Sequence, residues 1–380
     1  MTRIVPSRQG PGGLKPTDLL VGTVLFAVAV AYPLGFGLDW GSRPKDPLAA
    51  PEGVEDEGAP SAPGAEAAAP RPAPRGGSPE PSASARPKTG PASWAPDPAA
   101  AAWEKMTESL FRLATSYRGR VAIVLKDLST GNSWTYHQDD LFPSASLIKV
   151  PVMLCVFDSI NEGKVSLSDR VALRRKHRTG GSGSVKWSAD GTRLSVRDLL
   201  YRMINESDNT ATAMLLDTVG IDHVQAQLPK FGLFYTEVNP EGLSIKSGRV
   251  PRENYTTARE MTMMMERIYR GEMVSRASSE LMMDILKHRR ATRSRLAKGL
   301  PRGWELAHKT GLLRQACHDV AIVLTPYGDY VLTVLTGHNR SYRTAKDFIA
   351  RLGKVTYKYY DARGHLVAGA STRRGPLVVR

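Results

Sequence analysis

Apolar side chains recur every three or four residues along Trp103–Tyr117, and this spacing predicts an amphipathic helix where the folded region begins. The pattern then changes to short runs of aliphatic and aromatic residues, Val121–Leu125 and Trp134–Tyr136, with the polar segment Ser129–Asn132 between them. Runs of this kind joined by a glycine-containing turn are typical of a β-hairpin, which we expect here.

Helical spacing returns through the middle of the chain. An apolar run from Val150 to Phe157 predicts one helix, and Ser195–Asn205 and Thr257–Tyr269 begin with residues whose side chains cap helices. A further helix is expected over residues 275–289. Methionine commonly fills gaps in protein cores, so we expect a core position for the methionines of the third of these helices, Met261, Met263, Met264 and Met265.

Strand patterns follow near the end of the chain, at residues 304–309, 319–325 and 330–336, with a turn at 326–329. A last helix is predicted from Tyr342 to about Tyr357. Strands at both ends of a helical middle predict an α/β sandwich, in which an antiparallel sheet is built from N- and C-terminal strands and the helices form an insertion.

The first hundred residues differ from this pattern. We expect residues 1–17 to be a basic cytoplasmic N-terminus and the apolar residues 18–38 to be either a transmembrane anchor or a cleaved signal peptide. Residues 39–101 are rich in Pro and Ala and are expected to be a disordered linker. This organisation predicts an extracytoplasmic folded domain at 102–360, membrane-anchored or secreted, followed by a loose tail at 361–380.

The charge of the 380-residue chain is strongly basic, with a formal net charge of +15. No nucleic-acid-binding motif accompanies it and the arginines are scattered, so we interpret the charge as a solvated surface and expect no nucleic-acid partner. Cys155 and Cys317 both lie beside apolar runs and are expected to be small buried residues, although a disulfide between them stays open.

Ser146 and Lys149 are the first candidates for chemistry, because they open the apolar run that begins at Val150. Side chains three residues apart lie on one face of a helix. A serine needs a neighbouring base to become a nucleophile, and a lysine desolvated by apolar neighbours can be that base. A capping serine beside a surface lysine would give the same pattern, so further evidence is needed.

Two later tripeptides supply that evidence. Ser207-Asp208-Asn209 lies between two predicted helices, and Lys309-Thr310-Gly311 ends the first of the late strands. Ser-x-x-Lys, Ser-Asp-Asn and Lys-Thr-Gly in this order mark class A β-lactamases and penicillin-binding proteins. Residues 103–360 therefore resemble a class A β-lactamase or a near relative in the penicillin-binding serine hydrolase family.

The resemblance implies an acyl-serine hydrolase acting on a β-lactam or a peptidoglycan-derived acyl substrate. Ser146 would attack the carbonyl with Lys149 as base or base partner, and Ser207 would pass a proton to the leaving nitrogen. Asn209 would hold the substrate's side-chain amide. Lys309 and Thr310 would bind the substrate carboxylate, and Gly311 completes their motif. The backbone N–H groups of Ser146 and Leu312 would donate to the oxyanion.

The match departs from the family at the glutamate that activates water for deacylation. Ungapped counting places it at Glu241, but the Leu-Asn pair expected after it is absent, and Asn239 and Asn254 stand where the family has an arginine–aspartate bridge. Glu237 and Glu253 compete for the role. Three functions therefore stay open: a β-lactamase, a D-Ala-D-Ala carboxypeptidase or esterase-like relative with slow deacylation, and a non-catalytic wall-binding module.

We expect no metal and no other cofactor in this chemistry. The histidines, His177, His223, His308 and His318 among them, lack the spacing of metal ligands, which disfavours a zinc β-lactamase. For His308 and His318 we expect structural roles. The enzyme is expected to act as a monomer.

Overall fold

The computed structural model describes residues 97–243, 252–287, 294–313 and 315–373. The predicted basic N-terminus, the apolar segment 18–38, nearly all of the linker and the last seven residues lie outside the described part. Within the described residues, no helix combines the length and apolar character needed to cross a membrane.

A central antiparallel sheet organises the described chain. Its strand order is β2-β1-β9-β8-β7. The strands are β1 (Arg120–Asp127), β2 (Ser133–Tyr136), β7 (Glu305–Leu313), β8 (Ala316–Leu324) and β9 (Tyr330–Gly337). The hairpin β1–β2 and the three late strands thus join in one sheet around a helical insertion, which confirms the predicted fold class.

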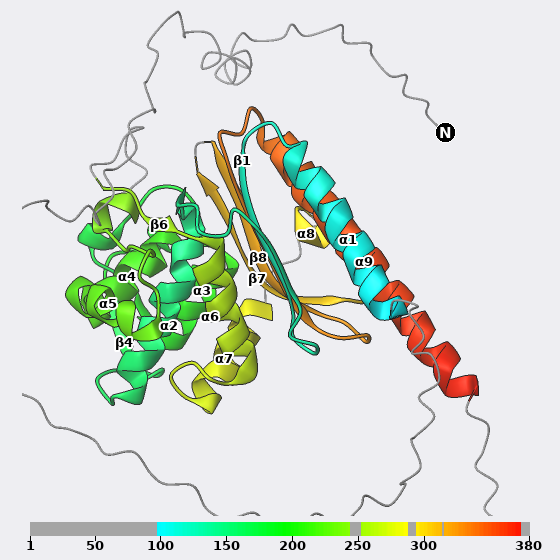
Figure 1. Cartoon of the computed structure of the whole chain (residues 1–380). Coiled ribbons are helices and arrows are strands. Elements are labelled where there is room, and N and C mark those ends of the chain that lie inside the picture. Colours follow the sequence, from blue (N-terminus) through cyan, green and yellow to red (C-terminus); the bar gives the residue numbers. More distant parts are fainter. Residues whose placement is uncertain (1–96, 244–251, 288–293, 314, 374–380) are drawn as a thin grey trace, which may run out of the picture. The chain divides into compact units, whose positions relative to one another are not determined.

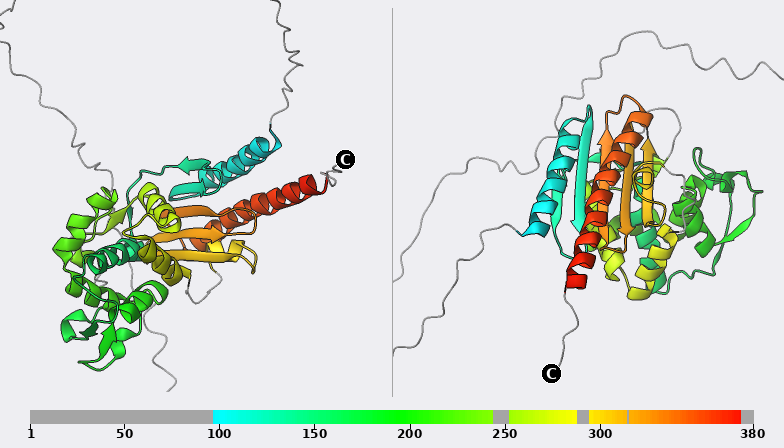
Figure 2. Two further views of the ribbon diagram at one scale, coloured as in Figure 1. Left: turned by 90° about the horizontal axis from the view of Figure 1, so that it is seen from below. Right: turned by 90° about the vertical axis from the view of Figure 1, so that its right-hand side faces the viewer.

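Both faces of this sheet are covered (Figure 1). On one face, α1 (Pro98–Thr115) and α9 (Tyr342–Arg373) lie side by side, in cyan and red, as Figure 2 also shows. Alternate residues of β1 belong to different cores: Ile123 packs with the α1–α9 layer, whereas Val124 packs with the helical insertion. Strands buried on both faces explain why the late strands read as nearly continuous apolar runs.

The helical insertion covers the opposite face. Its helices are α2 (Lys149–Asn161), α3 (Val196–Asn205), α4 (Asn209–Val219), α5 (Ile221–Gln227), α6 (Ala258–Arg270) and α7 (Arg276–Lys287), and the short α8 (Leu296–Gly299) follows. Helix α2 is buried along most of its length, from Lys149 to Phe157. Two small sheets pair β3 (Phe142–Pro143) with β6 (Tyr255–Thr256) and β4 (Arg170–Ala172) with β5 (Arg193–Ser195).

Local signals placed several helices correctly. The hydroxyl of Ser195 accepts a hydrogen bond from the backbone N–H of Asp198, and Thr257 does the same for Glu260, so both predicted caps are confirmed. Three of the four methionines predicted for the core, Met261, Met264 and Met265, are buried, and Met263 is partly buried. Both cysteines are buried and free.

Three boundaries differ from the prediction. Helix α1 begins at Pro98, inside the predicted linker, because Asp97 caps it and proline is favoured at a first helical position. The segment Lys309–Gly311 lies within β7 and does not end it, since the pairing with β8 continues to Leu313.

The third difference concerns the predicted loose tail, where α9 continues as a helix to Arg373. Tyr360 stacks on Tyr330 with ring centroids 4.3 Å apart, and Arg363 pairs with the buried carboxylate of Asp127 at 2.8 Å. Packing against the sheet therefore extends the helix beyond what its local sequence indicates.

Candidate active site

Ser146 lies in a single 3-10 turn, Ala145–Ile148, that leads directly into α2. The sequence predicted a position in the first helical turn, and the serine sits just before the regular α-helix. Ala145, the residue before it, has a φ of 47°, in the left-handed region that non-glycine residues rarely adopt. Such strain is typical of functional sites, where the surrounding structure holds it in place.

Lys149 begins α2 and is only 1 % exposed. Its Nζ donates to the Ser146 hydroxyl oxygen at 3.2 Å and to the Ser207 hydroxyl oxygen at 3.1 Å. Nζ also lies 2.7 Å from the backbone oxygen of Ser207 and 2.6 Å from Oδ1 of Asn209, so four oxygens share at most three N–H donors. One buried amine therefore joins the Ser-x-x-Lys and Ser-Asp-Asn segments.

Burial also sets the protonation of this lysine. Desolvation lowers the pKa of Lys149 to about 7, and the charge of Asp208 opposes the shift only in part. A lysine with such a pKa has a large neutral fraction near neutral pH, so it can accept a proton. The neutral amine would accept the hydroxyl proton of Ser146 through the 3.2 Å contact.

The Ser207-Asp208-Asn209 segment connects α3 to α4. Ser207 has a φ of 54°, a second strained non-glycine backbone in the site. Asp208 is fully buried and caps α4 by accepting from the N–H of Ala211, while its other oxygen accepts from the N–H of Val185. These bonds fix the turn that directs Ser207 towards the two lysines.

Strand β7 forms the third side of the site, at the edge of the sheet. Nζ of Lys309, a fully buried residue, donates to the Ser207 hydroxyl oxygen at 3.0 Å. Gly311 brings this strand against the Ser146 turn: a Cβ added there would lie 3.2 Å from both the Ser144 oxygen and the Ala145 Cβ. Glycine thus permits the close approach of the two segments.

Two buried residues that the sequence did not assign to the site support it. Nε2 of His318 donates to the Pro143 oxygen at 2.8 Å, because Nδ1 accepts from the Thr336 N–H. Burial lowers the pKa of His318 to about 4, so the ring stays neutral. Arg295, also buried, donates to the Gly311 oxygen at 3.4 Å. His318 pairs with Gly311 across β7 and β8, so aligning these two strands in the sequence could have placed His318 near the site. No local sequence signal marks Arg295.

His308, the residue before Lys309, interacts with the neighbouring strand β8. Its Nδ1 lies 3.0 Å from Oδ1 of Asp319 on β8. The other oxygen of Asp319 accepts from the N–H of Leu296. This geometry agrees with the structural roles predicted for His308 and His318.

Residues 105–360 match the model of the Beta-lactamase enzyme family. The chain belongs to this family. A β-lactamase of Stenotrophomonas maltophilia is 28 % identical over 251 residues, which cover 64 % of this chain and 82 % of the relative. The family match and this relative, together with the similar solved structures described next, make the protein a serine β-lactamase-like hydrolase.

Two solved structures share the fold. A β-lactamase from Sphaerobacter thermophilus aligns with a TM-score of 0.62 at 25 % identity, covering 68 % of this chain and 98 % of its own. A leucine-to-glutamate mutant of PBP-A, in an acyl-enzyme complex with penicillin G, aligns with a TM-score of 0.63 at 25 % identity, covering 68 % and 97 %. The structural neighbours thus include both a β-lactamase and PBP-A.

The loop that would carry the deacylating glutamate in this hydrolase is held by two asparagines. The backbone N–H of Asn239 donates to Oδ1 of Asn254 at 2.6 Å, and its Nδ2 donates to the Glu253 oxygen at 3.2 Å. The Asn254 oxygen in turn accepts from the N–H of Ser144, two residues before Ser146. The two asparagines thus bridge the base of the loop, where the family has an arginine–aspartate pair.

In the described part of the chain, no hydrogen bond joins Glu241 to the other predicted catalytic residues. Glu241 lies in a 3-10 turn, Pro240–Leu243, and is exposed. Among the described residues, the hydrogen-bond partners of Lys149 and Ser146 include no carboxylate. Residues 244–251 of the loop lie outside the described part. The structure therefore brings together Ser146, Lys149, Ser207, Asn209 and Lys309 and places Gly311 against the Ser146 turn, whereas the role of Glu241 stays a prediction.

Proposed function

We propose that this protein is an exported serine hydrolase that opens the β-lactam ring through an acyl-enzyme on Ser146. The observation that carries the proposal is the buried amine of Lys149, which contacts the hydroxyls of Ser146 and Ser207 at once. A surface lysine beside a capping serine would be solvated and would keep its ordinary pKa, so the capping alternative does not fit this geometry.

Acylation begins when neutral Lys149 takes the hydroxyl proton of Ser146. The serine oxygen then attacks the lactam carbonyl, and negative charge develops on the carbonyl oxygen. Backbone N–H groups of Ser146 and Leu312 would donate to that oxygen, since Gly311 holds β7 against the serine turn.

Ring opening needs a proton on the leaving nitrogen, and Ser207 is placed to deliver it. Its hydroxyl oxygen lies 3.1 Å from Nζ of Lys149 and 3.0 Å from Nζ of Lys309. The proton that Lys149 takes from Ser146 can pass through this hydroxyl to the nitrogen. The lysine is thereby returned to its neutral form.

Substrate orientation would come from the remaining residues of the site. Lys309, with Thr310 beside it, supplies a positive charge for the substrate carboxylate. Nδ2 of Asn209 donates to the Gly180 oxygen at 2.8 Å. When substrate is bound, the same N–H group would donate to the substrate's side-chain amide.

Deacylation distinguishes the two enzymatic candidates. In the β-lactamase candidate, Glu241 activates a water that hydrolyses the Ser146 ester. The second candidate is a penicillin-binding carboxypeptidase or esterase-like relative that deacylates slowly and takes a peptidoglycan-derived acyl donor. The exposed position of Glu241 favours this second candidate, and the similarity to PBP-A is compatible with it.

Time-resolved mass measurement with a penicillin tests both candidates in one experiment. Formation of a covalent adduct followed by rapid loss supports the β-lactamase. An adduct that persists for hours supports the penicillin-binding relative. Absence of both an adduct and hydrolysed penicillin would contradict both candidates.

A further inference from the structure

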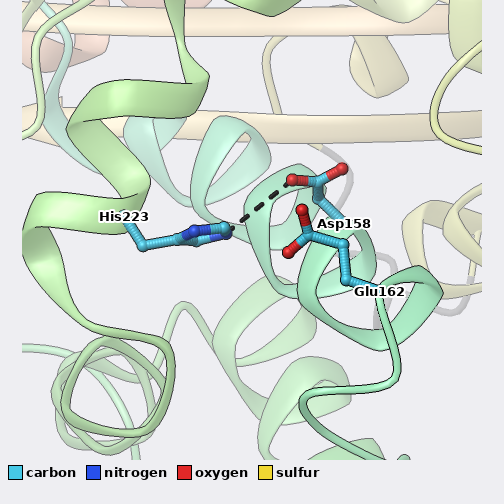
Figure 3. A group of neighbouring side chains, drawn as sticks. All are labelled: Asp158, Glu162 and His223. Carbon is cyan, nitrogen blue, oxygen red and sulfur yellow. Dashed lines mark ion pairs between the residues drawn. The ribbon is translucent and has the colours of Figure 1, made fainter.

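A group of three side chains outside the active site can hold a metal ion. Asp158 and Glu162 lie one turn apart at the C-terminal end of α2, and His223 faces them from α5 (Figure 3). One ligand atom from each residue lies within 4.8 Å of the others. The sequence did not indicate this group, because His223 is distant in the chain and only the packing of α5 on α2 brings it near.

The strongest observation is an unsatisfied oxygen. Oδ2 of Asp158 is buried and has no hydrogen-bond partner among the described residues. Nε2 of His223 lies 3.7 Å away, too far for a hydrogen bond. A buried polar atom without a partner is costly, and a bound cation would satisfy it.

We propose that Asp158, Glu162 and His223 bind one divalent transition metal ion, and that Zn²⁺ fits the site well. Imidazole and carboxylate are ligands that zinc takes at about 2.0–2.2 Å, which places neighbouring ligand atoms about 3.4 Å apart in a tetrahedron. The 3.7 Å between Oδ2 and Nε2 is close to that edge. Three protein ligands leave a fourth position for water.

Other polar groups near the three proposed ligands would compete only weakly with a metal ion for them. The Ser159 hydroxyl lies 3.1 Å from Nε2 of His223, and metal binding would displace this contact. Lys164 pairs with Glu162 at 2.7 Å, but its side chain is 60 % exposed, and such surface pairs contribute little to stability. Like Lys164, Lys230 carries a positive charge near the Asp158 carboxylate. Both lysines can move into solvent when the ion binds.

The site is separate from the acylation chemistry. Asp158 lies about 13 Å along the axis of α2 from Lys149, at about 1.5 Å per residue. An ion there would join α2 to α5 and stabilise the helical insertion. It would contact neither Ser146 nor the substrate.

The test uses the full chain, freed of metal with a chelator and titrated with ZnCl₂ by calorimetry and thermal unfolding. Wild type should bind one zinc ion. Its Tm should rise by about 5–10 °C at zinc about 100-fold above Kd. His223→Gln should weaken binding by about 100-fold or more. Glu162→Gln, a change at a partly exposed position, should weaken it too and guards against a folding defect in the first variant.

His137→Gln is the matched control, since His137 is a half-exposed histidine 3.9 Å from Asp140. This variant should bind zinc as wild type does, and the rate of penicillin labelling should be equal with and without zinc. Zinc binding that is absent in wild type, retained in both ligand variants, or lost in His137→Gln would overturn the proposal. None of these outcomes depends on turnover by the active site.

Discussion

Nζ of Lys149 lies 3.2 Å from the hydroxyl oxygen of Ser146, and burial lowers the pKa of this lysine to about 7. Below that pH the amine is protonated and cannot accept the serine proton. We therefore expect the rate of Ser146 acylation to rise with pH through about 7 and to level off above it. Labelling rates measured with a penicillin from about pH 5 to about pH 9 check this. A rate independent of pH across that range would contradict a basic role for Lys149.

Replacement of the serine tests the nucleophile. A labelled penicillin should mark wild type and fail to mark Ser146→Ala, because the variant lacks the hydroxyl that Lys149 would activate. Ser168→Ala, at an exposed serine, is the control and should label normally. Chelators should leave labelling unchanged. Label retained in Ser146→Ala would rule out the assignment.

Gly311 should be intolerant of even one methyl group. In Gly311→Ala the added Cβ would meet His318 Cδ2 at 3.0 Å and Ala145 Cβ at 3.2 Å, which moves β7 away from the Ser146 turn. A displacement of about 1 Å can cost on the order of 10²-fold in rate, so acylation should slow by about that factor.

Gly303→Ala is the matched control, since nothing lies within 4 Å of a Cβ there. This control should acylate at the wild-type rate. Equal rates in the two variants would show that the close approach at Gly311 does not matter for chemistry.

Glu241 separates the two enzymatic candidates. If its carboxylate activates water, Glu241→Gln should acylate normally but accumulate the adduct, with deacylation slowed by about 10²–10⁴-fold. Glu237→Gln and Glu253→Gln should leave decay of the adduct unchanged. Mass measurements over time distinguish the variants. If wild type holds the adduct for hours and Glu241→Gln behaves identically, the protein is a penicillin-binding relative.

Export is the remaining prediction. The basic residues 1–17 and the apolar residues 18–38 lead us to expect the hydrolase domain outside the cytoplasm, either anchored or released after residue 31. N-terminal sequencing of the mature protein decides between anchor and cleavage. Recovery of the full-length chain from the soluble cytoplasm would refute both.

Much of the fold was predictable because its signals are local. The caps at Ser195 and Thr257 are one-turn interactions, and the aliphatic run Val121–Leu125 is a signal carried by neighbouring residues alone. The extension of α9 could not be predicted, since it depends on Tyr330 and Asp127, which lie far away in the chain. The assignment of Glu241 as the deacylating carboxylate stays a prediction, because residues 244–251 of its loop lie outside the described part.

The sequence by itself determined which residue types are available: a serine and lysine one turn apart, a second serine in a turn, and a lysine on a late strand. Only the tertiary structure decided that Lys149 is buried among their hydroxyls, with its pKa lowered to about 7. The reason is physical. Spacing along the chain sets which side chains share a face, whereas desolvation and contact between distant segments arise only when α2, the Ser207 turn and β7 pack together.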